Sequence, residues 1–193
     1  QLASLLAWSA LGGGDRVGGL VFNEQGHEEI RPRRSRKTVL TLLSQIAEYN
    51  SGLPLGSASE QDSFAQMLTN LRRIARPGSS LFLVSDFRGA SHEGAREHLF
   101  ELAKHTELTA LACSDPLESE LPRSGTYAVT NGRERSELHT GDRQLRDSYR
   151  ARLQQQSELL RSDLIRLGVP LLQAWTHLPP FALLQKYFGD TRR

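Results

Sequence analysis

The sequence predicts an α/β protein with a mostly parallel sheet and helices on both faces, in a single domain over residues 1–193. Two observations predict this fold. The short apolar runs at 81–84 and 108–113 are typical of parallel strands that are buried on both faces. Segments with apolar residues at helical spacing stand between such runs, and this alternation predicts right-handed β-α-β units.

The first part of the chain predicts a helix, a hairpin and a second helix. Apolar residues at helical spacing over 2–10 predict the first helix, and three glycines at 12–14 end it. The runs at 17–22 and 27–30 predict a hairpin whose polar second strand lies at an edge of the sheet. A stripe of apolar residues over 39–46 predicts the next helix.

The middle of the chain continues the alternation. Helices are predicted over 64–75 and 95–103, and the strand at 108–113 follows the second of them. The run Leu81–Val84 is predicted to be a buried central strand. Its expected neighbours are the strands at 17–22 and 108–113, directly or across one missing strand.

The last part begins with a predicted hairpin around Asn131-Gly132, a dipeptide typical of two-residue hairpin turns. A long helix is predicted from Asp142 to Leu167, because apolar residues recur along it at helical spacing. An apolar segment at 169–175 follows, and Pro180 is expected to begin a short final helix.

Composition limits the classes of function. The chain has 193 residues, is 38% hydrophobic and 24% charged, and carries a net charge of +2, so no nucleic-acid partner is expected from overall charge. Cys113 is the only cysteine, which excludes an intramolecular disulfide and favours a cytoplasmic location. No apolar run approaches the roughly 20 residues of a membrane-spanning helix, so a membrane anchor is expected only upstream of Gln1.

Known catalytic motifs are absent from the sequence. It contains no phosphate-binding loop, no nucleophile-elbow serine, and no histidine pair or cysteine cluster of the zinc type. We therefore expect the chain to be noncatalytic. A site assembled from residues distant in sequence stays open as an alternative.

One charge run and one aspartate stand out as candidate sites. The run consists of Arg31, Arg33, Arg34, Arg36 and Lys37. It either binds phosphate, an acidic lipid surface or an acidic partner, or forms a solvated loop before the next helix, which is the interpretation we favour. Asp86 follows an apolar strand, where ligands gather in open α/β sheets, and its carboxylate could hold a divalent cation or only shape a turn.

Three motifs in order carry a family resemblance. They are Gly14-Asp-Arg-Val-Gly-Gly-Leu-Val-Phe22, Leu83-Val-Ser-Asp-Phe87, and Asp115-Pro-Leu-Glu118 ahead of Leu121-Pro122. With this spacing the chain resembles the bacterial family named domain of unknown function fifty-eight. The resemblance implies a Rossmann-like fold of the von Willebrand factor A type, with a metal-ion-dependent adhesion site at the top of its sheet.

In that fold an Asp-x-Ser-x-Ser loop, a threonine loop and an aspartate coordinate magnesium. Asp86 matches the aspartate, and Ser57 and Ser59 lie where the threonine loop falls. The Asp-x-Ser-x-Ser loop belongs before the first helix, and the chain begins inside that helix. The resemblance therefore implies that the first central strand is missing from the chain. We expect no cofactor here and an incomplete metal site, with Mg²⁺ possible in the full-length protein.

The missing strand leaves a slot in the expected sheet. An upstream segment, a strand exchanged with a second copy, or direct pairing of the flanking strands could fill it.

The resemblance also implies a function, because genes of this family often neighbour those of MoxR-type AAA+ ATPases. We therefore expect a protein-interaction scaffold or adaptor with such an ATPase as its partner. Two alternatives stay open: a metal-dependent hydrolase at the carboxyl end of the sheet, and a binder of anionic surfaces or nucleic acid through residues 31–37.

Overall fold

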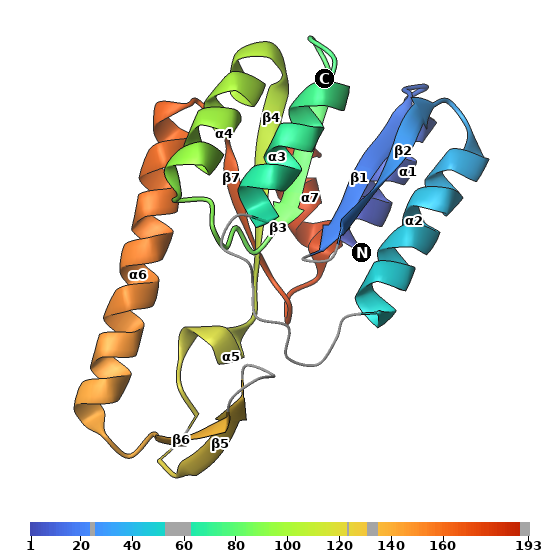
Figure 1. The fold of residues 1–193 in the computed structure, drawn as a ribbon. Coiled ribbons are helices and arrows are strands. Elements are labelled where there is room, and N and C mark those ends of the chain that lie inside the picture. Colours follow the sequence, from blue (N-terminus) through green and yellow to red (C-terminus); the bar gives the residue numbers. More distant parts are fainter. Residues whose placement is uncertain (24–25, 53–62, 123, 131–134, 190–193) are drawn as a thin grey trace. The chain divides into compact units, whose positions relative to one another are not determined.

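The computed structural model describes residues 1–23, 26–52, 63–122, 124–130 and 135–189 (Figure 1). The chain divides into two compact units. Unit 1 comprises Gln1–Leu55 and Pro180–Arg193, and unit 2 comprises Gly56–Pro179. The single domain predicted for the whole chain stays a prediction.

Unit 1 is built on an antiparallel hairpin. Its elements are α1 (Leu2–Gly12), β1 (Val17–Asn23), β2 (Gly26–Arg33), α2 (Arg36–Ser51) and α7 (Pro180–Phe188). The core of α1, the hairpin and α2 consists of Ala7, Val17, Ile30, Val39 and Leu42. These five apolar side chains come from four elements, so their burial holds the unit together.

Glycine allows the close packing of α2 on the hairpin. A Cβ atom at Gly19 would lie 2.7 Å from Cδ1 of Leu42, closer than side-chain carbons approach one another. The register between β1 and β2 also shifts between Val17 and Gly19, as at a β-bulge. The Gly18-Gly19 pair therefore serves backbone geometry, a role that a larger side chain would block.

Unit 2 contains a parallel sheet of three strands, β3 (Ser80–Ser85), β4 (Glu107–Ser114) and β7 (Leu171–Trp175), in the order β3-β4-β7. Three longer helices accompany it: α3 (Ser63–Ile74), α4 (Glu93–His105) and α6 (Arg143–Arg166). The short helix α5 (Pro116–Ser119) and the hairpin of β5 (Thr126–Thr130) and β6 (Arg135–His139) lie between β4 and α6 in sequence.

The core of unit 2 lies between the sheet and the helices α3 and α4, which lie in front of it in Figure 1. The buried residues of the two helices are Phe64, Met67, Leu68, Leu71, Ala95, Leu99 and Leu102. They recur at three- and four-residue spacing, the pattern from which both helices were predicted. The central strand β4 buries Leu108, Ala110, Leu111 and Ala112, as a strand covered on both faces does.

The α/β class, the parallel sheet and the predicted helices are confirmed, whereas the arrangement of the strands differs from the prediction. Among the described residues three strands are parallel and four form antiparallel hairpins. β3 lies at an edge of its sheet, so its predicted central place is wrong for the described part of the chain, and β4 is central instead. The fold of the von Willebrand factor A type stays a prediction.

The exposure of β3 also differs from the prediction of a fully buried strand. Leu83 is buried, but Phe82 and Val84 are only half-buried. β3 pairs with β4 as expected, and the described residues of β1 pair with β2. An apolar run shows that a strand packs against other elements, but it does not fix the position of that strand in the sheet order. The helix α5 is not among the predicted elements. None of the described helices is both long and apolar enough to cross a membrane.

Candidate functional site

The candidate site lies at the carboxyl ends of the three parallel strands of unit 2. β3 ends at Ser85, β4 at Ser114 and β7 at Trp175, and the parallel register places these ends at one edge of the sheet. The residues that follow are Asp86, Asp115 and Thr176. Polar side chains therefore follow all three strands, as expected where α/β sheets bind their ligands.

Asp86 is held by the loop that follows it. Its Oδ1 accepts hydrogen bonds from the backbone N of Arg88 at 3.1 Å and from Oγ of Ser85 at 3.4 Å. Its Oδ2 lies 3.1 Å from Nε of Arg88. Both carboxylate oxygens are thus engaged by the next loop residues.

A left-handed backbone at Phe87 makes this tight loop. The φ angle of Phe87 is 56°, which is uncommon for a residue other than glycine. Its side chain is only 5% exposed, and its ring centroid lies 5.7 Å from that of Phe64 on α3. Burial of the ring offsets the backbone strain and leaves Asp86 and Arg88 at the surface.

Arg88 connects the loop after β3 to the short helix after β4. Its Nη2 lies 3.2 Å from Oε1 of Glu118 on α5. The other oxygen of Glu118, Oε2, accepts a hydrogen bond from the backbone N of Asp115 at 3.2 Å. One guanidinium group therefore lies between two carboxylates that are 32 positions apart in sequence.

β7 joins the same network through hydroxyl and amide groups. Oγ1 of Thr176 donates to Oδ2 of Asp115 at 2.5 Å, and Nε2 of Gln173 donates to Oγ of Ser114 at 2.8 Å. Three carboxylates and one arginine thus share this edge, which leaves it with a net negative charge. The result is an exposed, hydrogen-bonded surface built from three segments of the chain.

The described residues do not fit a magnesium ion at this edge. Mg²⁺ requires several oxygen ligands in octahedral geometry, whereas Asp86 is committed to Arg88 and Glu118 to Arg88 and Asp115. No group of three or more acidic, histidine or cysteine side chains among the described residues could hold a metal ion. Ser57 and Ser59 lie outside the described residues.

Cys113 lies at the end of β4 and is half-buried. Burial raises the pKa of its thiol, and the Asp86 carboxylate raises it further. Because the thiolate is the nucleophilic form, both effects lower the reactivity of this side chain.

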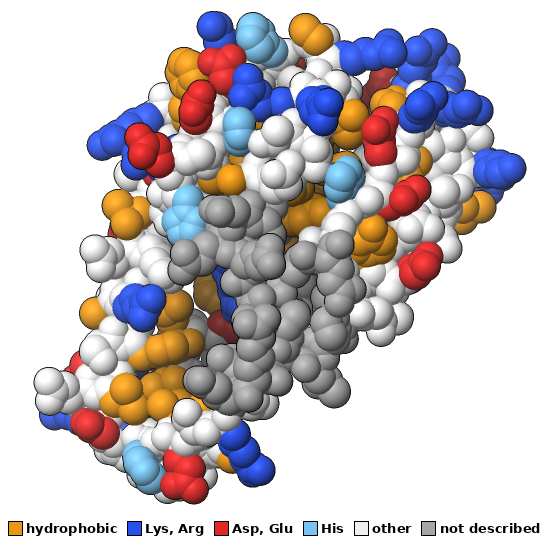
Figure 2. Space-filling model, in the orientation of Figure 1, with side chains coloured by type: hydrophobic (Ala, Val, Ile, Leu, Met, Phe, Trp, Pro, Cys, Tyr) orange, Lys and Arg blue, Asp and Glu red, His pale blue; other side chains and the backbone are white. Residues whose placement is uncertain are grey.

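The basic run lies in unit 1. The favoured interpretation of a solvated loop is right for only part of it. Arg31 and Arg33 belong to β2, and Arg36 and Lys37 begin α2. All five basic side chains are exposed, and none forms an ion pair with a carboxylate of the described residues. Lys and Arg side chains gather over this part of unit 1, at the upper right of Figure 2.

Sequence reasoning identified Asp86 but missed its partners. Arg88 is two residues away and Glu118 follows the next strand, so the parallel pairing of β3 with β4 was the signal that could have linked them. The motif Asp115-Pro-Leu-Glu118 is singled out in the sequence only by the family resemblance. It contributes to the site the carboxylates of Asp115 and Glu118 and the backbone N–H of Asp115.

Comparisons with known proteins agree with the quoted motifs. A family model described as "Protein of unknown function DUF58" matches residues 1–159. Uncharacterized proteins of Mycobacterium tuberculosis (strain H37Rv) and Mycobacterium bovis are each 27% identical over 194 residues, which cover 99% of the chain and 59% of the relative. The chain thus spans about three fifths of the length of these curated relatives. No solved structure matches the chain significantly.

Proposed function

The chain belongs to the family of proteins of unknown function DUF58, and from that premise we propose that it is a noncatalytic protein-interaction domain. It acts as an adaptor whose partner is a MoxR-type AAA+ ATPase. The partner binds at the carboxyl ends of β3, β4 and β7.

One observation carries this proposal, namely the exposed position of Arg88 between Asp86 and Glu118. The Arg88 side chain is 71% exposed, and ion pairs between exposed side chains contribute little to folding stability. A partner can therefore exchange one of these ion pairs for its own at little cost. Charges that are fixed by surrounding hydrogen bonds also give specificity and raise the rate of association.

Binding to the MoxR-type ATPase of the same genome, followed by biolayer interferometry, tests the proposal. We expect Arg88→Gln to weaken binding by about tenfold, because it removes a charge-assisted contact. Asp86→Asn should weaken binding to a similar extent, since it releases the Arg88 side chain. The control is Arg161→Gln on α6. This arginine is exposed, lies outside this edge, and forms no ion pair with the described residues.

Equal binding by the wild type and both edge variants would contradict the assignment of this surface. Absence of any saturable binding by the wild type would contradict the partner itself.

A specific observation favours a second candidate function, the binding of an anionic surface through residues 31–37. The first turn of α2 contains Arg36 and Lys37 and no acidic residue. Positive side chains at a helix N-terminus are unfavourable because they repel the positive end of the helix dipole. Basic side chains kept there without carboxylate partners among the described residues are available to bind an anion.

A further inference from the structure

A hollow of about 330 Å³ lies in unit 2. Its walls come from the end of α5, the segment that follows α5, and the first turns of α6. Side chains that line it include Ser119, Glu120, Leu121, Arg146, Tyr149 and Arg150. Two of them are arginines one helical turn apart, so both guanidinium groups project from the same side of α6.

Arg146 is held in place but keeps most of its hydrogen-bond donors. It is half-buried, and its Nη1 donates to the carbonyl oxygen of Thr140. Thr140 is itself fully buried, and its backbone N donates to the carbonyl oxygen of Gly125 at 2.9 Å. No carboxylate of the described residues forms an ion pair with Arg146. A partly desolvated charge that lacks a counterion is unfavourable, so an anion in the hollow would stabilise it.

Arg150 is paired, but only weakly. Its Nη2 lies 3.4 Å from Oε1 of Glu120, and its Nη1 lies 4.0 Å from Oδ1 of Asp147. The Glu120 side chain is 70% exposed, so its pairing with Arg150 contributes little to stability. Glu120 can therefore be replaced by an incoming carboxylate.

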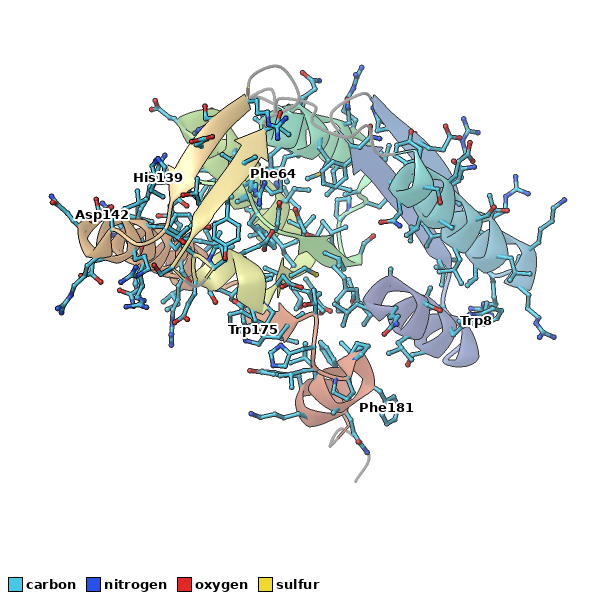
Figure 3. The ribbon with its side chains drawn as sticks, turned by 90° about the horizontal axis from the view of Figure 1, so that it is seen from below. Trp8, Phe64, His139, Asp142, Trp175 and Phe181 are labelled. Atoms are coloured by element: carbon cyan, nitrogen blue, oxygen red, sulfur yellow. The ribbon has the colours of Figure 1, made fainter. Side chains whose placement is uncertain are left out.

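Tyr149 makes the wall between the two arginines rigid. Its hydroxyl donates to the backbone carbonyl oxygen of Glu118 at 2.9 Å, which ties α6 to α5. At the start of the helix the side chain of Asp142 accepts hydrogen bonds from the backbone N of Gln144 and Leu145. Figure 3 shows Asp142 at this end of α6, near His139 at the end of β6. The cationic groups therefore stand on a fixed frame and need little ordering to bind a ligand.

The surroundings of the hollow favour a protein ligand. The first ten residues of α6 contain Arg143, Arg146, Arg150 and Arg152 against the single acidic residue Asp147. Tyr127 and Val129 on the neighbouring hairpin in sequence are large apolar side chains left exposed. An arginine-rich helix end favours acidic residues in a ligand. The exposed apolar residues of β5, which begins two residues after the lining residue Ser124, favour apolar residues beside them.

We propose that this hollow binds an acidic side chain of a partner protein. The carboxylate takes up the free donors of Arg146 and displaces Glu120 from Arg150. This inference goes beyond the adaptor function proposed above, because it concerns a different surface with the opposite charge requirement.

Fluorescence polarisation with two labelled hexapeptides tests the inference. One peptide alternates glutamate with leucine, and the other has glutamine in place of every glutamate. We expect the glutamate peptide to bind saturably to the full chain and the glutamine peptide to bind at least about tenfold more weakly, because hydrogen bonds between charged groups are the stronger kind.

Variants of this surface are expected to change affinity in opposite directions. Arg146→Gln should weaken binding of the glutamate peptide by about tenfold, whereas Glu120→Gln should strengthen it by about threefold, because it removes the competing carboxylate. The matched control is Arg161→Gln, an exposed arginine on the same helix but outside its first ten residues. Its affinity should stay within about twofold of the wild type, as for a screened surface charge.

A circular dichroism spectrum of Arg146→Gln checks that the variant folds. If it does not fold, Glu120→Gln and Arg150→Gln carry the test.

Equal binding of the two peptides, or weaker binding to Glu120→Gln, would overturn the inference. Displacement of a bound label by inorganic phosphate but not by the glutamate peptide would show that the hollow is not a carboxylate site. Arg88→Gln should leave peptide binding unchanged, so this inference and the adaptor function can fail separately.

Discussion

At the scale of single residues, Arg88 determines the chemistry of the strand ends. It forms ion pairs with Asp86 and Glu118, and the left-handed backbone of Phe87 places it there. Asp86 could be singled out from the sequence because it directly follows an apolar strand. Its pairing with Glu118 through Arg88 could not, because it depends on the register of β3 with β4, a contact between segments far apart in the chain.

The single cysteine gives a prediction at the same scale. Burial and the Asp86 carboxylate both raise the pKa of Cys113. At a given pH, a smaller fraction of this thiol is therefore ionised in the folded chain than in the unfolded chain. We expect iodoacetamide at pH 8 to alkylate the folded chain at least about fivefold more slowly than the urea-unfolded chain, since only the thiolate reacts. Asp86→Asn should speed alkylation of the folded chain, because it removes the negative charge. Intact-mass spectrometry over time measures both rates, and a folded rate equal to the unfolded one would contradict the prediction.

At the scale of helices and strands, the sequence located most elements because their signals are local. The three glycines at 12–14 end α1, and the Asp142 side chain caps α6. Sheet order depends instead on which strands pair. No local pattern in the β3 run indicates that β3 lies at the edge of the described sheet. α5 has only four residues, too few to show a helical period.

The basic end of β2 and α2 carries the prediction at this scale. We expect the chain to sediment with vesicles that contain phosphatidylserine, and this binding to fall as the salt concentration rises. The triple substitution Arg31→Gln, Arg33→Gln and Arg34→Gln should weaken vesicle binding by up to about 100-fold, because each basic residue near an anionic surface contributes about 1 kcal/mol.

The matched control for the vesicle assay is the triple substitution Arg152→Gln, Arg161→Gln and Arg166→Gln on α6, which changes the net charge equally. Equal losses in the two triple variants would mean that total charge, and not this end of unit 1, decides binding. Failure of the wild type to sediment with the vesicles would rule out an anionic lipid surface as the ligand.

At the scale of the whole molecule, the packing is uneven. β4 is paired on both sides and buries most of its apolar residues, whereas all described residues of the β5–β6 hairpin except Leu138 are exposed. Isolated two-stranded hairpins are marginally stable in water, so this hairpin depends on its ends. The hydrogen bonds of Thr140 to the carbonyl oxygen of Gly125 close one of them.

Hydrogen exchange followed by mass spectrometry should reveal this difference in packing between β4 and the β5–β6 hairpin. We expect peptides from Glu107–Ser114 to exchange most slowly and those from the β5–β6 hairpin to exchange by at least about 100-fold faster, because buried strands open only with larger unfolding events. Similar protection of the two regions would show that the hairpin is stabilised by contacts other than those described.

The length of α6 gives the hollow a mechanical connection to the sheet. Arg146 lies near one end of this helix and the fully buried Leu164 near the other, 18 residues apart, or about 27 Å at the rise of an α-helix. The hydrogen bond from Tyr149 to Glu118 holds the first end, and burial of Leu164 holds the second. One rigid helix therefore joins the hollow to the core beside β7, which α6 contacts.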